Sequence, residues 1–245
     1  MLISQTEPTI RPNPFISARA TSAAARPSRC FMITIESIQV GKVVTEGDAD
    51  AREVTDKQWT SAFRKTPISG SVKVGSLGIE GDQVADTKHH GGVDKAILCY
   101  ASAHYTAWRD EHPELDFAPG GFGENLTLIG MTEADVCIGD RWSAGGCVFE
   151  VSQPRQPCWK IARRWETKTM TKEVTQTGRT GWYLRVVRGG ELAAGQTVTL
   201  TSRPHPDWSV ARANDVLFGR EVDRLAVFAL MNLGELSDEW KRSIA

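Results

Sequence analysis

The stretch QPRQPCWK, residues 153–160, places a single cysteine between a proline and a basic segment. Pro157 restricts the backbone ahead of Cys158, which stands at the start of the helix that CWKIARRW predicts. Unpaired backbone N–H groups in a first helical turn, with Arg155 close by, favour the thiolate form of a thiol. A thiolate is a ligand for soft metals and a group for sulfur chemistry.

The same helix also allows a purely structural interpretation. Cys158, Ile161 and Trp165 fall on one stripe of its surface, and a free cysteine is most often a small buried hydrophobic residue. The opposite face carries basic side chains that we expect in solvent: Lys160, Arg163 and Arg164. Spacing alone therefore leaves open whether Cys158 is packed or reactive.

A second candidate segment is KHHGGVDKA, residues 88–96. Neighbouring histidines point to opposite faces of an extended segment, so they form a poor chelating pair for one metal. The paired glycines let backbone N–H groups turn toward an anion, and a lysine lies on either side. A polar loop with one hydrogen-bonded histidine explains the pattern equally well. The candidates here are Lys88, His89, His90, Gly91, Gly92 and Lys95.

Two further stretches carry weaker signals. PGGFGENL, residues 119–126, lacks the third glycine of a dinucleotide motif and the lysine of a P-loop. Its Glu124 and Asn125 can offer hydrogen bonds to a heterocycle, or the stretch is simply a turn before a strand. Arg185, in the strand that WYLRVV predicts, faces either a barrel mouth or solvent. The chain contains no G-x-S-x-G, H-E-x-x-H or Walker motif, which argues against hydrolases and NTPases.

Composition sets the class of protein that must position these residues. The 245 residues are 40% hydrophobic and 24% charged, as in a folded protein with one substantial core. A net charge of -1 gives no overall attraction to nucleic acids or anionic membranes. No apolar run approaches the roughly 18 residues that span a bilayer. Five scattered cysteines without C-x-x-C argue against a disulfide framework and favour a reducing, cytoplasmic location.

The predicted fold is mainly β. Short strands separated by glycine-containing turns predict an antiparallel barrel over residues 32–205, with a few short helices. Helix-spaced apolar residues then predict a three-helix segment over residues 206–245. Residues 1–31, with four arginines and no apolar core, predict a flexible extension. That extension is either an organellar leader or an over-long start.

Four motifs, GDQVADTKHHGGVDKAI, GGFGENLT, VSQPRQPCWKI and RTGWYLRV, occur in this order and resemble the MOSC domain family. Within it, the chain is most similar to the YiiM subgroup. The resemblance implies a β-barrel that binds the molybdenum cofactor, a pterin with a dithiolene and a phosphate, and it implies that Cys158 is the molybdenum ligand. The cofactor contacts it implies are Lys88, His89, His90, Gly91, Gly92, Asn125, Arg155 and Arg185.

The implied activity is reduction of N-hydroxylated bases and related compounds such as 6-hydroxylaminopurine. A histidine, His89 or His90, is the candidate proton donor, since imidazole titrates near neutral pH. The chain has no flavin fingerprint and no iron–sulfur cysteine pattern, so we expect electrons from a separate reductase. The alternative is a carrier of the cofactor or of sulfur that reduces nothing. A homodimer is allowed by the sequence but not indicated by it.

Overall fold

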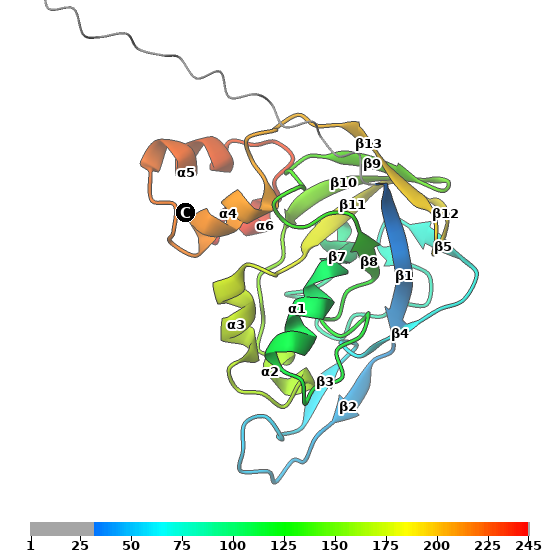
Figure 1. Ribbon diagram of the computed structural model, residues 1–245, viewed down its shortest axis with the longest axis vertical. Helices are drawn as coiled ribbons and strands as arrows, with labels where there is room; N and C mark the ends of the chain where they lie inside the picture. The colour runs from blue at the N-terminus through cyan, green and yellow to red at the C-terminus, as the bar shows by residue number, and fades with distance from the viewer. Residues whose placement is uncertain (1–31, 245) are drawn as a thin grey trace, which may run out of the picture. The chain divides into compact units, whose positions relative to one another are not determined.

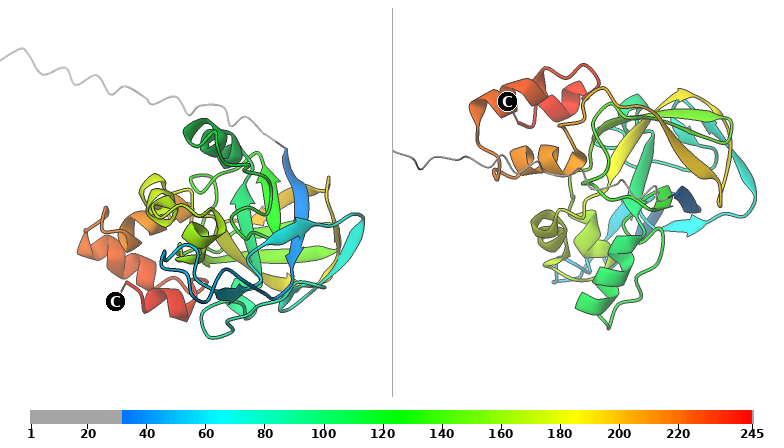
Figure 2. Two further views of the ribbon diagram at one scale, coloured as in Figure 1. Left: turned by 90° about the horizontal axis from the view of Figure 1, so that it is seen from below. Right: turned by 45° about the horizontal axis from the view of Figure 1, so that its top comes forward.

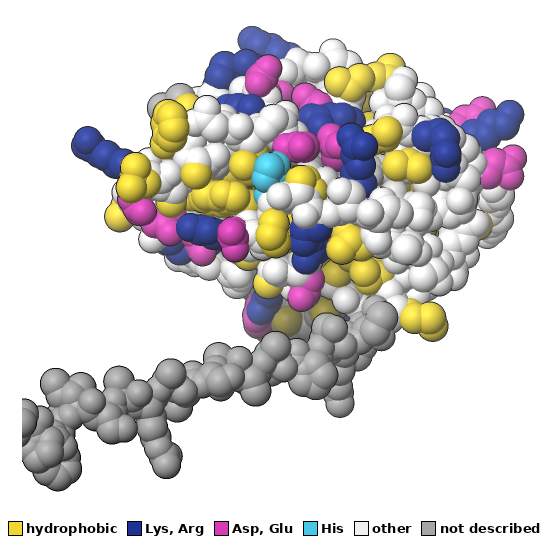
Figure 3. All heavy atoms as spheres, turned by 90° about the horizontal axis from the view of Figure 1, so that it is seen from above, with side chains coloured by type: hydrophobic (Ala, Val, Ile, Leu, Met, Phe, Trp, Pro, Cys, Tyr) yellow, Lys and Arg dark blue, Asp and Glu magenta, His cyan; other side chains and the backbone are white. Residues whose placement is uncertain are grey.

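The computed structural model describes residues 32–244, which form one compact unit. The predicted extension at residues 1–31 lies outside the described residues. Basic and acidic side chains are interspersed over the face of the molecule drawn in Figure 3. In the part of the chain that the structure describes, no helix has the length and apolar content needed to cross a membrane.

A closed seven-stranded β-barrel forms the body of the described chain (Figure 1). Around the barrel the strands follow the order β13-β9-β10-β11-β7-β8-β1, and β1 pairs again with β13. Their bounds are β1 Ile33–Gly41, β7 Ile97–Ala101, β8 Leu126–Ile129, β9 Arg141–Ala144, β10 Cys147–Pro154, β11 Trp182–Arg188 and β13 Thr197–Ser202. The predicted mainly-β barrel is confirmed.

The barrel departs from the predicted antiparallel arrangement at one seam. Strands β7 and β8 run parallel, with Cys99 opposite Leu126, whereas the other barrel pairs are antiparallel. A parallel pair needs a long crossover connection rather than a tight turn. Here the connection contains helix α1 (Ala103–Glu111) and the loop that holds Glu124.

Smaller strands extend the barrel at its rim. Strand β4 (Lys65–Pro67) pairs with the end of β1. The remaining strands form a three-stranded sheet and a two-stranded ribbon: β12 (Gly190–Ala193), β5 (Ser71–Gly75) and β6 (Gly78–Ile79), then β2 (Val44–Glu46) and β3 (Trp59–Ser61).

Two apolar clusters hold these elements together. Alternating residues of the strands, among them Ile35, Trp142 and Trp182, fill the barrel interior because successive side chains of a strand point to opposite faces. A second cluster packs α1, with buried Tyr105 and Trp108, against α2 (Lys160–Arg164) and α3 (Met170–Thr177). The buried Tyr105 and Trp108 of α1 form the face that packs into this cluster.

Three short helices follow the barrel and lie together beside it (Figure 2). They are α4 (Val210–Leu217), α5 (Arg224–Met231) and α6 (Asp238–Lys241). Each begins at a side chain that accepts a hydrogen bond from a first-turn N–H group: Ser209, Asp223 and Ser237. Trp208, Leu236 and Trp240 belong to the same apolar cluster as the barrel interior, so the segment and the barrel share one core.

Candidate functional site

Two adjoining cavities open where the loop over residues 82–95 meets the segment before α2 and strand β11. The first, here the Lys65 cavity, is lined by Lys65, Asp82, Asn125, Arg155 and Lys160 among others. The second, here the Glu239 cavity, is lined by His89, Gln153, Gln156, Trp159 and Glu239. Both are lined in addition by Asp86, His90, Lys95, Cys158 and Tyr183.

Cys158 lies at the junction of these cavities. It is partly exposed, whereas the other free cysteines of the described chain, Cys99, Cys137 and Cys147, are buried. The Cys158 carbonyl oxygen accepts hydrogen bonds from the Ile161 N–H at 3.1 Å and from a threonine hydroxyl of α3 at 3.2 Å. The backbone at Cys158 is therefore fixed while the residue lines both cavities, and the interpretation of Cys158 as a packed core residue is wrong.

Arg155 brings an unneutralised positive charge into the Lys65 cavity. It is 3% exposed, and its guanidinium donates to the carbonyl oxygens of Thr180, at 3.2 Å, and Phe122, at 3.1 Å. No carboxylate within residues 32–244 pairs with it. A buried cation without a counter-ion is costly, so the cavity is suited to an anion.

Lys160 adds a second such charge and corrects a prediction. We expected its side chain in solvent, but Lys160 is 6% exposed and lines the Lys65 cavity. The described residues offer it neither a carboxylate nor a hydrogen-bond acceptor. Helix α2 begins only two residues after Cys158, so its first turn lies against the cavity. Helical spacing groups side chains on one face of a helix but does not show which part of the protein that face contacts.

Lys65 and Asn125 belong to a hydrogen-bonded wall of the same cavity. The Lys65 ammonium lies 2.6 Å from Asp82 Oδ2, and burial lowers the pKa of Lys65 against the opposing effect of Asp82. Asn125 Nδ2 donates to Asp82 at 2.8 Å, and its Oδ1 accepts from the Leu98 N–H at 3.1 Å. Asn125 thus braces the wall, and its predicted contact with a cofactor stays a prediction.

The two histidines occupy different positions, as their adjacency suggested. His90 lines both cavities, while exposed His89 lines the Glu239 cavity, with Nδ1 3.1 Å from Asp86 Oδ2. Burial, followed by the charge of Lys160, lowers the pKa of His90 to about 4, with Asp86 acting in the opposite direction. His90 is therefore neutral near pH 7, and the choice of His89 or His90 as the proton donor stays a prediction.

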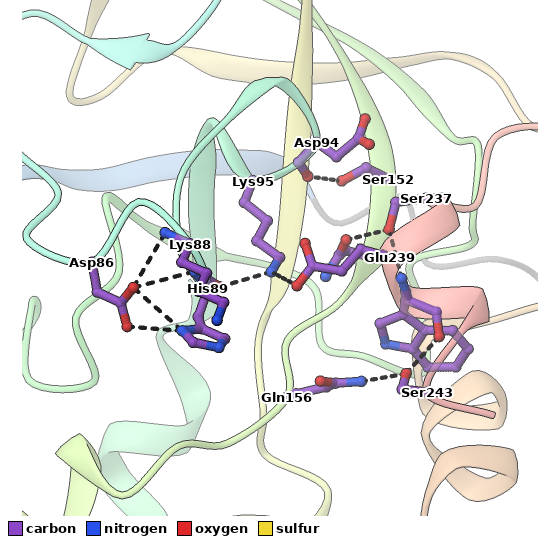
Figure 4. A network of polar contacts seen from close by, with 12 residues as sticks. Asp86, Lys88, His89, Asp94, Lys95, Ser152, Gln156, Ser237, Glu239 and Ser243 are labelled. Carbon is purple, nitrogen blue, oxygen red and sulfur yellow. Dashed lines mark hydrogen bonds and ion pairs between the residues drawn. The ribbon is translucent and has the colours of Figure 1, made fainter.

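The glycine pair shapes the loop that carries these histidines. Gly91 and Gly92 have φ of 74° and 83°, in the left-handed region that favours glycine. The turn brings Lys95 rather than Lys88 to the cavities, and of the two glycines Gly91 lines one of them. Lys95 Nζ donates to the His89 carbonyl at 2.8 Å and to Glu239 Oε1 at 2.6 Å (Figure 4).

Arg185 lies outside both cavities, so its predicted contact with a cofactor is not supported. Its Nε donates to Asp94 Oδ1 at 2.8 Å, and Nη1 pairs with Glu150. Its Nη2 donates to the carbonyl oxygen of Glu235 at 3.2 Å. These neighbours hold the guanidinium against the base of the loop over residues 82–95, where it positions Asp94 and the adjoining Lys95.

The Glu124 side chain stabilises the loop that contains it. Its buried carboxylate accepts from the Gly120 and Phe122 N–H groups at 2.7 and 3.1 Å, and from the Tyr105 hydroxyl at 2.5 Å. A carboxylate engaged by these donors faces into the loop. The interpretation of this stretch as a turn before a strand is correct, and that of Glu124 as a heterocycle contact is wrong.

Sequence reasoning missed several cavity residues because they come from separate segments: Lys65, Asp82, Lys160, Tyr183 and Glu239. Three of them had a signal, since Asp82, Lys160 and Tyr183 lie inside the motifs GDQVADTKHHGGVDKAI, VSQPRQPCWKI and RTGWYLRV. Burial raises the pKa of Tyr183 to about 12, so its hydroxyl stays protonated. Within the described residues no three His, Cys, Asp or Glu side chains gather in a metal-binding group. A metal at Cys158 must therefore bring further ligands with it.

Comparison with known proteins identifies the family. Residues 86–199 match the MOSC domain, and residues 208–245 match the YiiM-like, 3-alpha helix domain. The chain belongs to the YiiM subgroup of the MOSC domain family. The protein YflK of Bacillus subtilis is 36% identical over 197 residues, covering 80% of this chain and 89% of YflK.

Two further similarities add a structure and a longer protein. The crystal structure of YiiM from Geobacillus stearothermophilus superimposes with a TM-score of 0.71 at 33% identity, covering 87% of this chain and all of that one. A protein named "Reductase" from Gibberella moniliformis is 40% identical over 166 residues. That match covers 66% of this chain but 29% of the reductase, which therefore contains much additional sequence.

Proposed function

We propose that this protein is a molybdenum-cofactor-dependent reductase of N-hydroxylated bases and related N-hydroxylated compounds. The observation that carries the proposal is the meeting of the partly exposed Cys158 thiol with two buried, unpaired cations, Arg155 and Lys160, at one cavity. Membership of the MOSC family and the reductase name of the Gibberella relative support it.

The cavity residues fit the cofactor in charge and in ligand type. Cys158 supplies the soft ligand that molybdenum prefers, and the dithiolene of the pterin would complete a coordination that the described side chains cannot. Arg155 and Lys160 would bind the phosphate, because buried cations pair strongly with phosphate oxygens. Gly91 allows the backbone to approach the bound group closely.

The reaction consumes two electrons and two protons, converting R–NHOH to R–NH₂ and water. When bound at Cys158, the cofactor would supply the two electrons that cleavage of the N–O bond requires. Neutral His90 can hold the substrate hydroxyl by a hydrogen bond, and exposed His89, beside Asp86, can pass protons from solvent. The electrons come from a separate reductase.

The test is to purify the protein from cells that make the cofactor, then measure molybdenum, pterin and turnover of 6-hydroxylaminopurine with an artificial reductant. We expect about one molybdenum per chain and turnover. Stoichiometric molybdenum without turnover of any N-hydroxylated compound would contradict the reductase and favour the cofactor carrier.

Changing Cys158 to Ser removes the soft ligand, because a hydroxyl binds molybdenum far more weakly than a thiolate. We expect a loss of molybdenum content and of turnover of at least about tenfold, because even changes next to metal ligands cost about that much in metal affinity. Cys137→Ser is the matched control, since Cys137 lies outside both cavities and its thiol donates to the Pro206 carbonyl oxygen, 3.6 Å away. Equal molybdenum in both variants would remove Cys158 as the ligand.

A further inference from the structure

The Glu239 cavity is built from three separate parts of the chain (Figure 4). The loop over residues 82–95 contributes His89 and Lys95, and the segment before α2 contributes Gln156 and Trp159. Helix α6 of the C-terminal segment contributes Glu239, which is tied across the cavity to Lys95. The hydrogen bond from Gln156 Nε2 to the Ser243 hydroxyl, 2.6 Å, holds the turn that follows α6 against the segment before α2.

Trp159 offers this cavity an aromatic surface directly beside Cys158. It is 53% exposed, although indole is among the largest apolar side chains. Trp59 contacts it edge-on, with ring centroids 6.0 Å apart, and the Arg163 guanidinium lies 5.3 Å from its centroid. The ring is thus fixed by its neighbours while much of its surface stays free, an arrangement that suits stacking of a planar ring.

Glu239 offers the same cavity a fixed carboxylate. One oxygen, Oε1, accepts from Lys95 at 2.6 Å, and the described residues supply no donor to the other. The Lys95 side chain is nearly buried, whereas that of Glu239 is 52% exposed. The ion pair therefore orients a carboxylate that keeps one oxygen available to a ligand N–H group.

We propose that Trp159 and Glu239 recognise the substrate. A planar nitrogen heterocycle stacks on Trp159, a ring or amino N–H donates to the free Glu239 oxygen, and the N-hydroxyl group then points to Cys158. This inference rests on the proposed function and names the substrate class: flat heterocycles with N–H donors, in preference to anionic or non-aromatic N-hydroxyl compounds. It also makes helix α6, outside the barrel, a part of the substrate site.

The first test compares kcat/KM for 6-hydroxylaminopurine and for hydroxyurea, a small non-aromatic N-hydroxyl compound. Glu239→Gln should lower the value for the purine about 10-fold, the usual size of one hydrogen bond to a charged group. Asp238→Asn is the matched control, because Asp238 is the neighbouring residue of α6 with its side chain 87% exposed. This control should stay within about twofold of the wild type, as surface changes do.

Trp159→Ala should lower kcat/KM for the purine by about 10-fold or more, the usual cost of losing one stacked base. Trp159→Phe should retain most of the value, since a phenyl ring still stacks. Hydroxyurea turnover should change little in either variant. Equal losses for both substrates, or loss of molybdenum and pterin from Trp159→Ala, would mean that Trp159 holds the cofactor and would overturn the proposal.

Binding of adenine to the cofactor-loaded protein, measured by calorimetry, separates this proposal from the proposed function. Adenine has the ring and the N–H donors but no hydroxyl to reduce. Weaker adenine binding in both Glu239→Gln and Trp159→Ala supports the recognition site even where the wild type turns over no N-hydroxylated compound. Unchanged adenine affinity in both variants overturns it, whatever the turnover.

Discussion

His90 shows how strongly a cavity can set the ionisation of one side chain. Its neighbours are mostly positive, Lys160, Arg155 and Lys95, against the single carboxylate of Asp86. With a folded-state pKa near 4, below the ordinary value of 6.5, the unfolded chain binds a proton more readily than the native one. The His90 contribution to stability is therefore present above about pH 6.5 and is lost as the pH falls toward 4.

Removing one of these charges should shift the titration. Changing Lys160 to Met should raise the pKa of His90 from about 4 toward 6.5, because a repelling cation is gone. Nuclear magnetic resonance of the imidazole carbons across pH 3 to 8 measures the shift directly. Lys168→Met, at an exposed lysine paired with Glu53, should leave His90 unchanged. An unaltered His90 titration in Lys160→Met would show that Lys160 does not face the imidazole.

At the scale of elements, Arg185 positions the loop that carries the glycine pair. It links strand β11 to Asp94 at the base of that loop and to Glu150 of β10. Ser152 of β10 also donates to the Asp94 carbonyl oxygen, at 2.5 Å. The loop is thereby fixed on both sides of Asp94, which keeps Lys95 within reach of Glu239.

Changing Arg185 to Lys should loosen this loop, because an ammonium cannot replace the planar fork that contacts two carboxylates at once. We expect faster amide hydrogen exchange over residues 86–95 and a fall of about 1–2 kcal/mol in the free energy of unfolding. Arg188→Lys, at an exposed position of the same strand, is the control. Identical exchange in the two variants would show that Arg185 does not hold the loop.

The sequence predicted the strands and helices better than it predicted which side chains from different elements contact one another. Glycine-containing turns and helix-spaced apolar residues correctly indicated the barrel and the C-terminal helices, and the motifs contain Cys158, Arg155 and His90, which line one cavity. Spacing within a helix or strand indicates which side chains share a face, but not which other part of the protein that face contacts. That is why Lys160 was expected in solvent. The cofactor contact of Arg185 was instead implied by the family resemblance, and Arg185 does not line either cavity. Glu239 carried no local signal, because its role depends on contact with Lys95, far away in the sequence.

At the scale of the whole molecule, the C-terminal segment is part of the main core. Trp240 is 1% exposed and belongs to the apolar cluster of the barrel interior. Changing it to Ala should lower the free energy of unfolding by about 3–5 kcal/mol, as loss of a buried aromatic side chain does. Urea denaturation measures this value. Phe228→Ala, at the 67% exposed Phe228 of α5, should change stability by no more than about 0.5 kcal/mol.

A small effect of Trp240→Ala, equal to that of Phe228→Ala, would mean that the helices fold independently of the barrel. A large effect would also bear on the proposed substrate site. Helix α6 carries both Trp240 and Glu239, so the packing that stabilises the core also fixes the carboxylate at the cavity.

The pairing of β1 with β13 affects how the chain folds during its synthesis. Ile33 of β1 pairs with Val198 of β13. The barrel therefore cannot close until β13, the last barrel strand to be synthesised, is available to pair with β1, the first. During synthesis β1 keeps an unpaired edge, and exposed strand edges promote aggregation between chains. Closure through contacts so distant in sequence is slow. The yield of folded protein in the cell should therefore depend on the rate of translation elongation. It should also depend on chaperones that cover the unpaired edge of β1 until residue 198 emerges from the ribosome.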